Sequence, residues 1–199
     1  MNHRTGFLVS AALLLAACGG KKNSAARGPS DTTSTARSGG MAAQALAEHL
    51  TRPSWMTVDS AAKTVSLDIE AGKTGDNNHW NFNGYLRGDA TLTVPEGYKV
   101  TVHFKNDDPA MPHSFAVLSQ VGDYPAMIQN PKPVFDGAMS SNATSPTGGT
   151  KPGQSETISF TASTPGQYAI VCVQPAHAAA GMWMHFNVSS NGMVGLSTS

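Results

Sequence analysis

In several short segments beyond residue 63, apolar and polar residues alternate with a period of two, the pattern of β-strands with one buried face. Turn-forming runs such as Pro95-Glu96-Gly97 separate these segments. Many short strands with frequent turns predict an all-β fold, a β-sandwich with Greek-key connections. The expected strands cover residues 64–69, 90–94, 99–104, 113–118, 156–161, 167–171 and 183–188.

Two segments depart from the alternation. Residues 41–50 consist largely of strong helix formers and are soon followed by Pro53, which predicts a short N-terminal helix. Residues 119–154 show no period and contain several Pro, Gly and Ser, which predicts a long irregular loop. A loop of that length in a compact domain is usually functional or mobile.

The N-terminus has the layout of an export signal. Residues 1–17 begin with charged side chains, continue with an uncharged run and end in Leu-Ala-Ala before Cys18. The apolar run falls short of the roughly 20 residues of a membrane-spanning helix. Leu-Ala-Ala-Cys is similar to the lipobox of bacterial lipoproteins, which implies a lipidated Cys18 and a membrane anchor outside the cytoplasm. The alternative is an ordinary cleaved signal with an incidental cysteine.

The remaining chain divides into a tether and one domain. Residues 18–40 have almost no large apolar side chain, so we expect a flexible tether there. Residues 41–199 have the length of a single domain. That part holds 8 Lys and Arg against 12 Asp and Glu, with the lysines scattered. A mildly acidic body without a basic face argues against binding to nucleic acid.

The chain contains only two cysteines, and the second has a distinctive context. If Cys18 is lipidated, Cys172 has no disulfide partner in an oxidising compartment. A buried inert thiol is one explanation, and a thiolate bound to a metal is another. Only the second also explains the spacing Cys-x4-His-x4-Met that Cys172 forms with His177 and Met182.

A second imidazole, His113, precedes this loop within Met-Pro-His-Ser-Phe. Two His and one Cys with a weak axial Met form the type 1, or blue, copper site of electron-transfer proteins. We therefore expect one copper ion, and its predicted ligands are His113, Cys172, His177 and Met182. Met184 competes for the axial position, but it falls in the predicted last strand, where methionine commonly fills a core.

The other histidines are weaker candidates. His103 and His185 alternate with apolar neighbours and should face solvent, His49 lies on the predicted helix, and His79 has no identifiable partner. We expect surface or structural roles for all four.

Several short motifs around the predicted ligands belong together. They are Trp-Asn-Phe-Asn-Gly-Tyr at 80–85, Val-Pro-Glu-Gly-Tyr-Lys-Val at 94–100, Pro-His-Ser at 112–114 and Gly-Gln-Tyr-Ala-Ile-Val-Cys at 166–172. With the length of the ligand loop, they make the chain resemble cupredoxins of the sulfocyanin and rusticyanin type between residues 55 and 188. The resemblance implies that Ser114 supports the thiolate by hydrogen bonding. It departs at the N-terminus, where a lipobox and tether stand in place of the membrane helix of archaeal sulfocyanins.

By this resemblance, the protein is expected to be a monomeric carrier of single electrons in an extracytoplasmic respiratory chain, and not an enzyme. Its expected partners are redox proteins of the cytochrome or terminal oxidase type. The ring edge of His177 should reach solvent through an apolar docking patch. That patch would comprise Met111, Pro112, Pro175, Ala176, Ala178, Ala179, Ala180 and Met182.

Two other functions use the same residues. In copper handling, the site would buffer or deliver the ion; carriers of that kind often use clustered methionines, whereas the 9 Met here are dispersed. A catalytic copper enzyme would need an open coordination position. The complete set of Cys, two His and Met argues against an open position.

Overall fold

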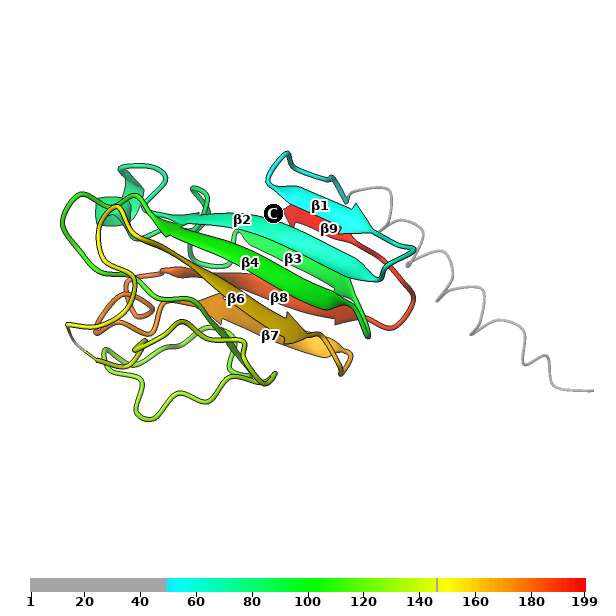
Figure 1. Cartoon of the computed structure of the whole chain (residues 1–199). Helices are drawn as coiled ribbons and strands as arrows, with labels where there is room; N and C mark the ends of the chain where they lie inside the picture. Colours follow the sequence, from blue (N-terminus) through cyan, green and yellow to red (C-terminus); the bar gives the residue numbers. More distant parts are fainter. Residues whose placement is uncertain (1–49, 146) are drawn as a thin grey trace, which may run out of the picture. The chain divides into compact units, whose positions relative to one another are not determined.

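The computed structural model describes residues 50–145 and 147–199 and shows two β-sheets in that part of the chain (Figure 1). The first sheet has the order β1-β2-β4-β6 and consists of β1 (Met56–Asp59), β2 (Thr64–Ala71), β4 (Lys99–Asn106) and β6 (Ser155–Thr161). The second has the order β5-β7-β8-β3-β9 and consists of β5 (Ala116–Leu118), β7 (Gly166–Val171), β8 (Trp183–Ser189), β3 (Ala90–Pro95) and β9 (Gly195–Thr198).

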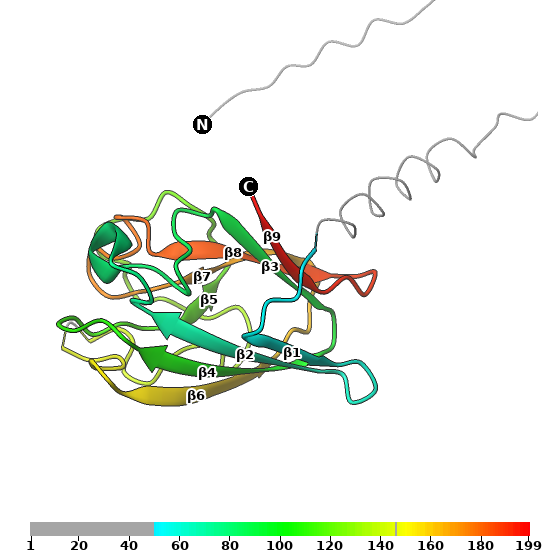
Figure 2. The same ribbon diagram turned by 90° about the horizontal axis from the view of Figure 1, so that it is seen from above.

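The two sheets pack face to face around one main core, as the view from above shows (Figure 2). Both sheets are mixed, since β2 runs parallel to β4 and β3 runs parallel to β8 while the other pairs are antiparallel. Alternate residues point inward: Leu67, Val102 and Phe186, for example, are at most 1% exposed. The period-two pattern of β2, β4 and β6 gives each of these strands one buried face, as expected for a β-sandwich, whereas β5 and most of β7 are buried on both faces.

All seven expected strands are present, with one wrong boundary. The strand predicted at 113–118 begins only at Ala116. His113 instead forms an isolated bridge with Thr150, through backbone bonds of 3.0 and 2.8 Å in the two directions. Residues 113–118 are all buried, so this segment lacks the single buried face of an ordinary strand.

Three elements have no counterpart among the expected ones: β1, β9 and the 3-10 helix η1 (Asp76–His79). Each has 4 residues, too few to show a period. The expected N-terminal helix falls outside the described residues except for Leu50, which is not helical. The signal at 1–17 and the tether at 18–40 also lie outside them. In the part described, no helix is long and apolar enough to cross a membrane.

The described residues of the long segment 119–154 contain no strand or helix, as predicted, but they are well packed. Tyr124 and Ala143 join a second apolar cluster with Ala169 and Val171 of β7. Phe135 reaches the main core and stacks on Phe160 with ring centroids 5.7 Å apart. This loop thus serves as a structural cover of the five-stranded sheet.

The described chain begins at the end of the sandwich that lies away from the loop between β7 and β8 (Figure 1). Thr51 pairs with Leu196 of β9 through a backbone hydrogen bond of 2.8 Å. The β7–β8 loop lies at the other end, beside the segment that follows β4. Leu50, the first described residue, therefore lies toward the end of the sandwich opposite the predicted ligands (Figure 1).

Candidate metal centre

Two chain segments bring the predicted ligands together. His113 lies between β4 and β5, whereas Cys172 directly follows β7 and Met182 directly precedes β8. The backbone N–H of Cys172 donates to the carbonyl of Met182 at 3.1 Å, and that of Met182 donates to His177 at 2.9 Å. These bonds close the loop, so that His177 folds back over the end of β7.

The donor atoms of His113, Cys172 and His177 lie within 4.8 Å of one another, the one such group found in the described residues. The Nδ1 atoms of His113 and His177 are 3.1 Å apart. The Cys172 Sγ lies 3.8 Å from the Nδ1 of His113 and 3.4 Å from the Nδ1 of His177. A flat trigonal site with bond lengths like those of zinc would separate the nitrogens by roughly 3.5 Å and each from sulfur by roughly 3.7 Å. The observed triangle fits a single ion.

Burial controls the protonation of these groups. Cys172 and His113 are 0% exposed and His177 is 2% exposed. Burial raises the pKa of the Cys172 thiol to about 11, although hydrogen bonds from Ser114 and Gln174 act to lower this pKa. Burial and then the neighbouring His113 lower the pKa of His177 to about 4. Near neutral pH the metal-free site thus holds a thiol and neutral imidazoles, and binding of a metal ion must displace the thiol proton.

Asp108 orients His113. Its Oδ2 lies 2.8 Å from the Nε2 of His113, which leaves Nδ1 directed at the cluster. Burial opposes ionisation of Asp108, but backbone N–H groups of Ala110 and Met111 and the His113 ring lower its pKa overall. The carboxylate therefore accepts a hydrogen bond from Nε2, a contact that fixes the tautomer of a metal-binding histidine. The sequence interpretation missed this role because Asp108 stands in a turn-like run next to Pro109.

Ser114 supports the sulfur, as the resemblance implied. Its backbone N–H donates to the Cys172 Sγ at 3.4 Å, and its Oγ lies 3.7 Å from that sulfur. The same Oγ accepts a hydrogen bond from the Val173 N–H at 3.0 Å. Ser114 therefore ties the His113 segment to the ligand loop.

His177 reaches solvent less than expected, because the residue is only 2% exposed. The indole of Trp80 stacks on the imidazole with centroids 4.1 Å apart and an interplanar angle of 19°. Trp80 entered the sequence interpretation only as part of a family motif, and nothing local could have linked it to His177.

The expected apolar patch is smaller than predicted. Ala178 and Met182 are buried, at 3% and 0% exposure, and belong to the packing under the surface. Met111, Ala176 and Ala179 are exposed, and the remaining members of the patch are half-buried.

The remaining candidates stay outside the cluster. His103 is exposed, as expected, but His185 is half-buried with its ring edge-on to Trp183 at 5.2 Å. His79 lies 3.4 Å from the carbonyl of Gly72, and His49 falls outside the described residues. Met184 is fully buried within β8, consistent with a core methionine.

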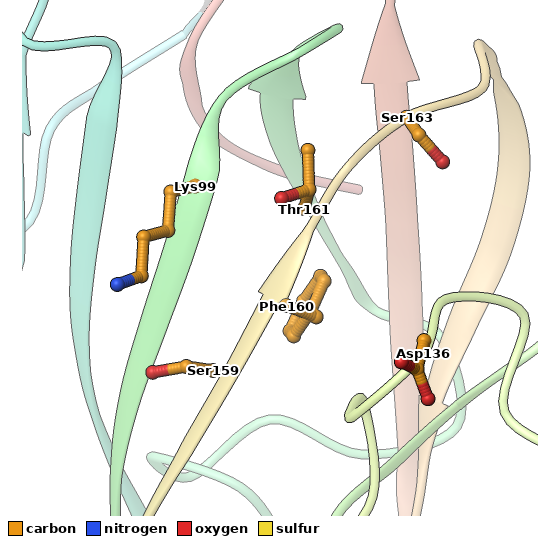
Figure 3. Close-up of a pocket in the computed structure, with 6 residues that line it drawn as sticks. All are labelled: Lys99, Asp136, Ser159, Phe160, Thr161 and Ser163. Carbon is orange, nitrogen blue, oxygen red and sulfur yellow. The ribbon is translucent and has the colours of Figure 1, made fainter.

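A shallow hollow of about 360 Å³ lies elsewhere (Figure 3). This hollow lies beside the start of β4 and the end of β6, at the opposite end of these strands from His113. Its lining includes no Cys or His. Its lining residues are Lys99, Asp136, Ser159, Phe160, Thr161 and Ser163.

A β-sandwich that gathers one cysteine and two histidines at one end, with a methionine in the same loop, is a cupredoxin, and this donor set suits one type 1 copper ion. The sulfocyanin (SoxE) domain model matches residues 33–198. A curated sulfocyanin of Sulfolobus acidocaldarius is 32% identical over 136 residues, which cover 66% of this chain and 67% of that protein. The chain belongs to the sulfocyanin family.

Solved structures with similarity to the chain include an auracyanin and a rusticyanin. Auracyanin of Roseiflexus castenholzii is 28% identical, with a TM-score of 0.44, covering 62% of this chain and 96% of that one. Rusticyanin of Thiobacillus ferrooxidans is 22% identical, with a TM-score of 0.43, covering 75% of this chain and 93% of that one.

Proposed function

We propose that the protein transfers single electrons through a type 1 copper centre whose ligands are His113, Cys172, His177 and Met182. The observation that carries this proposal is the triangle of one sulfur and two nitrogens, each from a buried side chain. A copper ion bound there would supply the redox chemistry by changing between Cu(II) and Cu(I). Soft sulfur suits Cu(I), and imidazole suits both states.

The chain's own residues keep the donors in place. Cys172 and Met182 lie at the ends of paired strands, β7 and β8, and Asp108 and Ser114 restrain His113 and the sulfur. Donors held by packed strands change position little when the charge of the metal changes, which favours fast electron exchange. The full donor set leaves no open position for a substrate, which supports a carrier over an enzyme.

An extracytoplasmic, lipid-anchored setting is part of the same proposal. The export signal and the lipobox at Cys18 support it. The start of the described chain, at the end of the sandwich away from the metal centre, is consistent with a tether that leaves the centre accessible. Redox proteins of the cytochrome or terminal oxidase type, within a respiratory chain, are the proposed partners of a monomeric carrier.

A redox titration of the copper-loaded protein, followed by exposure of the reduced form to a Cu(I) chelator, tests this function. An electron carrier gives a reversible one-electron transition and keeps its copper through repeated cycles. Loss of the reduced ion to the chelator within one cycle would contradict electron transfer and support copper delivery instead.

A further inference from the structure

Trp80 covers the metal centre from outside, on a loop that sequence reasoning left without a role. Its indole is half-buried, whereas the His177 ring beneath it is 2% exposed. With centroids 4.1 Å apart and 19° between planes, the two rings are stacked face to face. The indole is thus the outer wall of the centre on the side of His177.

The backbone before Trp80 adopts an unusual conformation that places the ring. Asn77, Asn78 and His79 have φ values of 51°, 57° and 65°, three successive residues in the left-handed region. Asparagine tolerates this region, but a run of three non-glycine residues is rare and persists only where other contacts enforce it. One such contact is the bond from the Asn77 side-chain amide to the Trp80 carbonyl, at 3.1 Å.

Asn81 fixes the same segment from the inside. It is 0% exposed, and its side-chain amide donates to the carbonyls of Thr74 and Asp76 at 2.9 and 3.1 Å. Its side-chain oxygen accepts from the backbone N–H groups of Thr74 and Gly84 at 3.3 and 3.2 Å. A buried amide satisfied in this way holds a loop rigidly.

Residues 72–88, which we term the covering loop, touch both ligand-bearing segments. A Cβ at Gly72 would lie 2.7 Å from the backbone nitrogen of Asp108, so the loop begins in close contact with the partner of His113. Near the end of the loop, the backbone N–H of Arg87 donates to the carbonyl of Gly181 at 2.8 Å, and Gly181 directly precedes Met182. The position of Trp80 is therefore tied to that of the ligands.

We propose that Trp80 is a positioning residue that holds the His177 ring and, through the face of its indole, favours the oxidised state of the centre; this rests on the proposed function. The face of an indole attracts positive charge within about 6 Å of its centroid, and tryptophan does so best among the aromatic side chains. An imidazole bound to Cu(II) carries more positive charge than one bound to Cu(I). Trp80 should therefore stabilise the oxidised form more than the reduced form.

Trp80→Leu and Trp80→Phe separate this effect from simple coverage. Leucine still shields His177 from water but has no π face, and phenylalanine restores a weaker one. In copper-loaded Trp80→Leu, the equilibrium with a reference redox couple should shift about threefold toward the reduced form, while the visible absorption is retained. Trp80→Phe should lie between Trp80→Leu and the unaltered protein. Trp55→Leu is the matched control, since Trp55 is also half-buried against the main core.

Proton NMR of the metal-free and Cu(I) forms tests the stacking without reference to redox activity. The ring protons of His177 should be shifted upfield by the indole, and Trp80→Leu should abolish that shift while Trp55→Leu leaves it intact. Two results would overturn the role of Trp80 alone. One is the absence of the upfield shift in the unaltered protein. The other is a redox equilibrium in Trp80→Leu that stays unchanged or moves toward the oxidised form. A protein that takes up no copper would overturn the proposed function and the tuning role together.

Discussion

At the scale of single residues, the centre depends on side chains that would not bind the metal. Asp108 sets the tautomer of His113, Ser114 contacts the sulfur and Trp80 covers His177. Each acts on one donor from outside the cluster, and such contacts tune metal affinity and reduction potential.

Replacement of Asp108 should test the first of these contacts. Asp108→Ala removes the acceptor for the His113 Nε2 and should lower copper affinity about 10- to 100-fold. Asp108→Asn retains an acceptor but loses the negative charge, so affinity should be largely kept while the reduction potential rises. Competition with a chelator and a redox titration measure the two effects. The neighbouring Asp107→Asn is the control, because Asp107 pairs with Lys105 at 2.7 Å instead; equal effects at both positions would contradict an orienting role.

At the scale of elements, the sequence predicted the features that arise from patterns within one short segment, and it missed those that arise from contacts between distant segments. The strands follow from patterns within short stretches of neighbouring residues, and the ligand loop follows from the spacing between Cys172 and Met182. Trp80 and Asp108 depend on contacts between segments far apart in the chain, which no local pattern encodes. The burial of His177 was misjudged for the same reason, because the covering loop that shields it comes from before β3.

Two neighbouring alanines of the ligand loop should respond differently to a charge. Ala179 is exposed, so Ala179→Asp should leave the copper spectrum intact and slow reduction by a cytochrome-type donor several-fold if this surface docks the partner. Ala178 is 3% exposed, so Ala178→Asp would bury an unpaired carboxylate and should destabilise the protein by about 3 kcal/mol or more. Stopped-flow reduction and chemical denaturation measure these effects. Unchanged donor kinetics in Ala179→Asp would contradict docking there.

At the scale of the whole molecule, the sandwich keeps three polar donors in an apolar interior, a placement that has a cost in the metal-free protein. Both imidazoles have lowered pKa values, chiefly through burial, so the unfolded chain binds protons that the folded chain does not. Stability then rises with pH wherever the unfolded state holds more protons.

The metal-free protein should accordingly lose stability as the pH falls from about 6.5 toward about 4, the window between the ordinary pKa of histidine and that of His177. Thermal unfolding at a series of pH values measures this loss. His177→Gln removes one titrating group and should flatten the dependence. A midpoint that stays constant over this window would contradict the burial of neutral imidazoles.

The absorption spectrum of the copper-loaded protein tests the metal centre most directly. A thiolate bound to Cu(II) in a trigonal site with two imidazoles should give an intense visible band, and Cys172→Ala should remove it while the fold persists. A copper-loaded protein without that band, or a Cys172→Ala variant that keeps it, would contradict a centre built on Cys172.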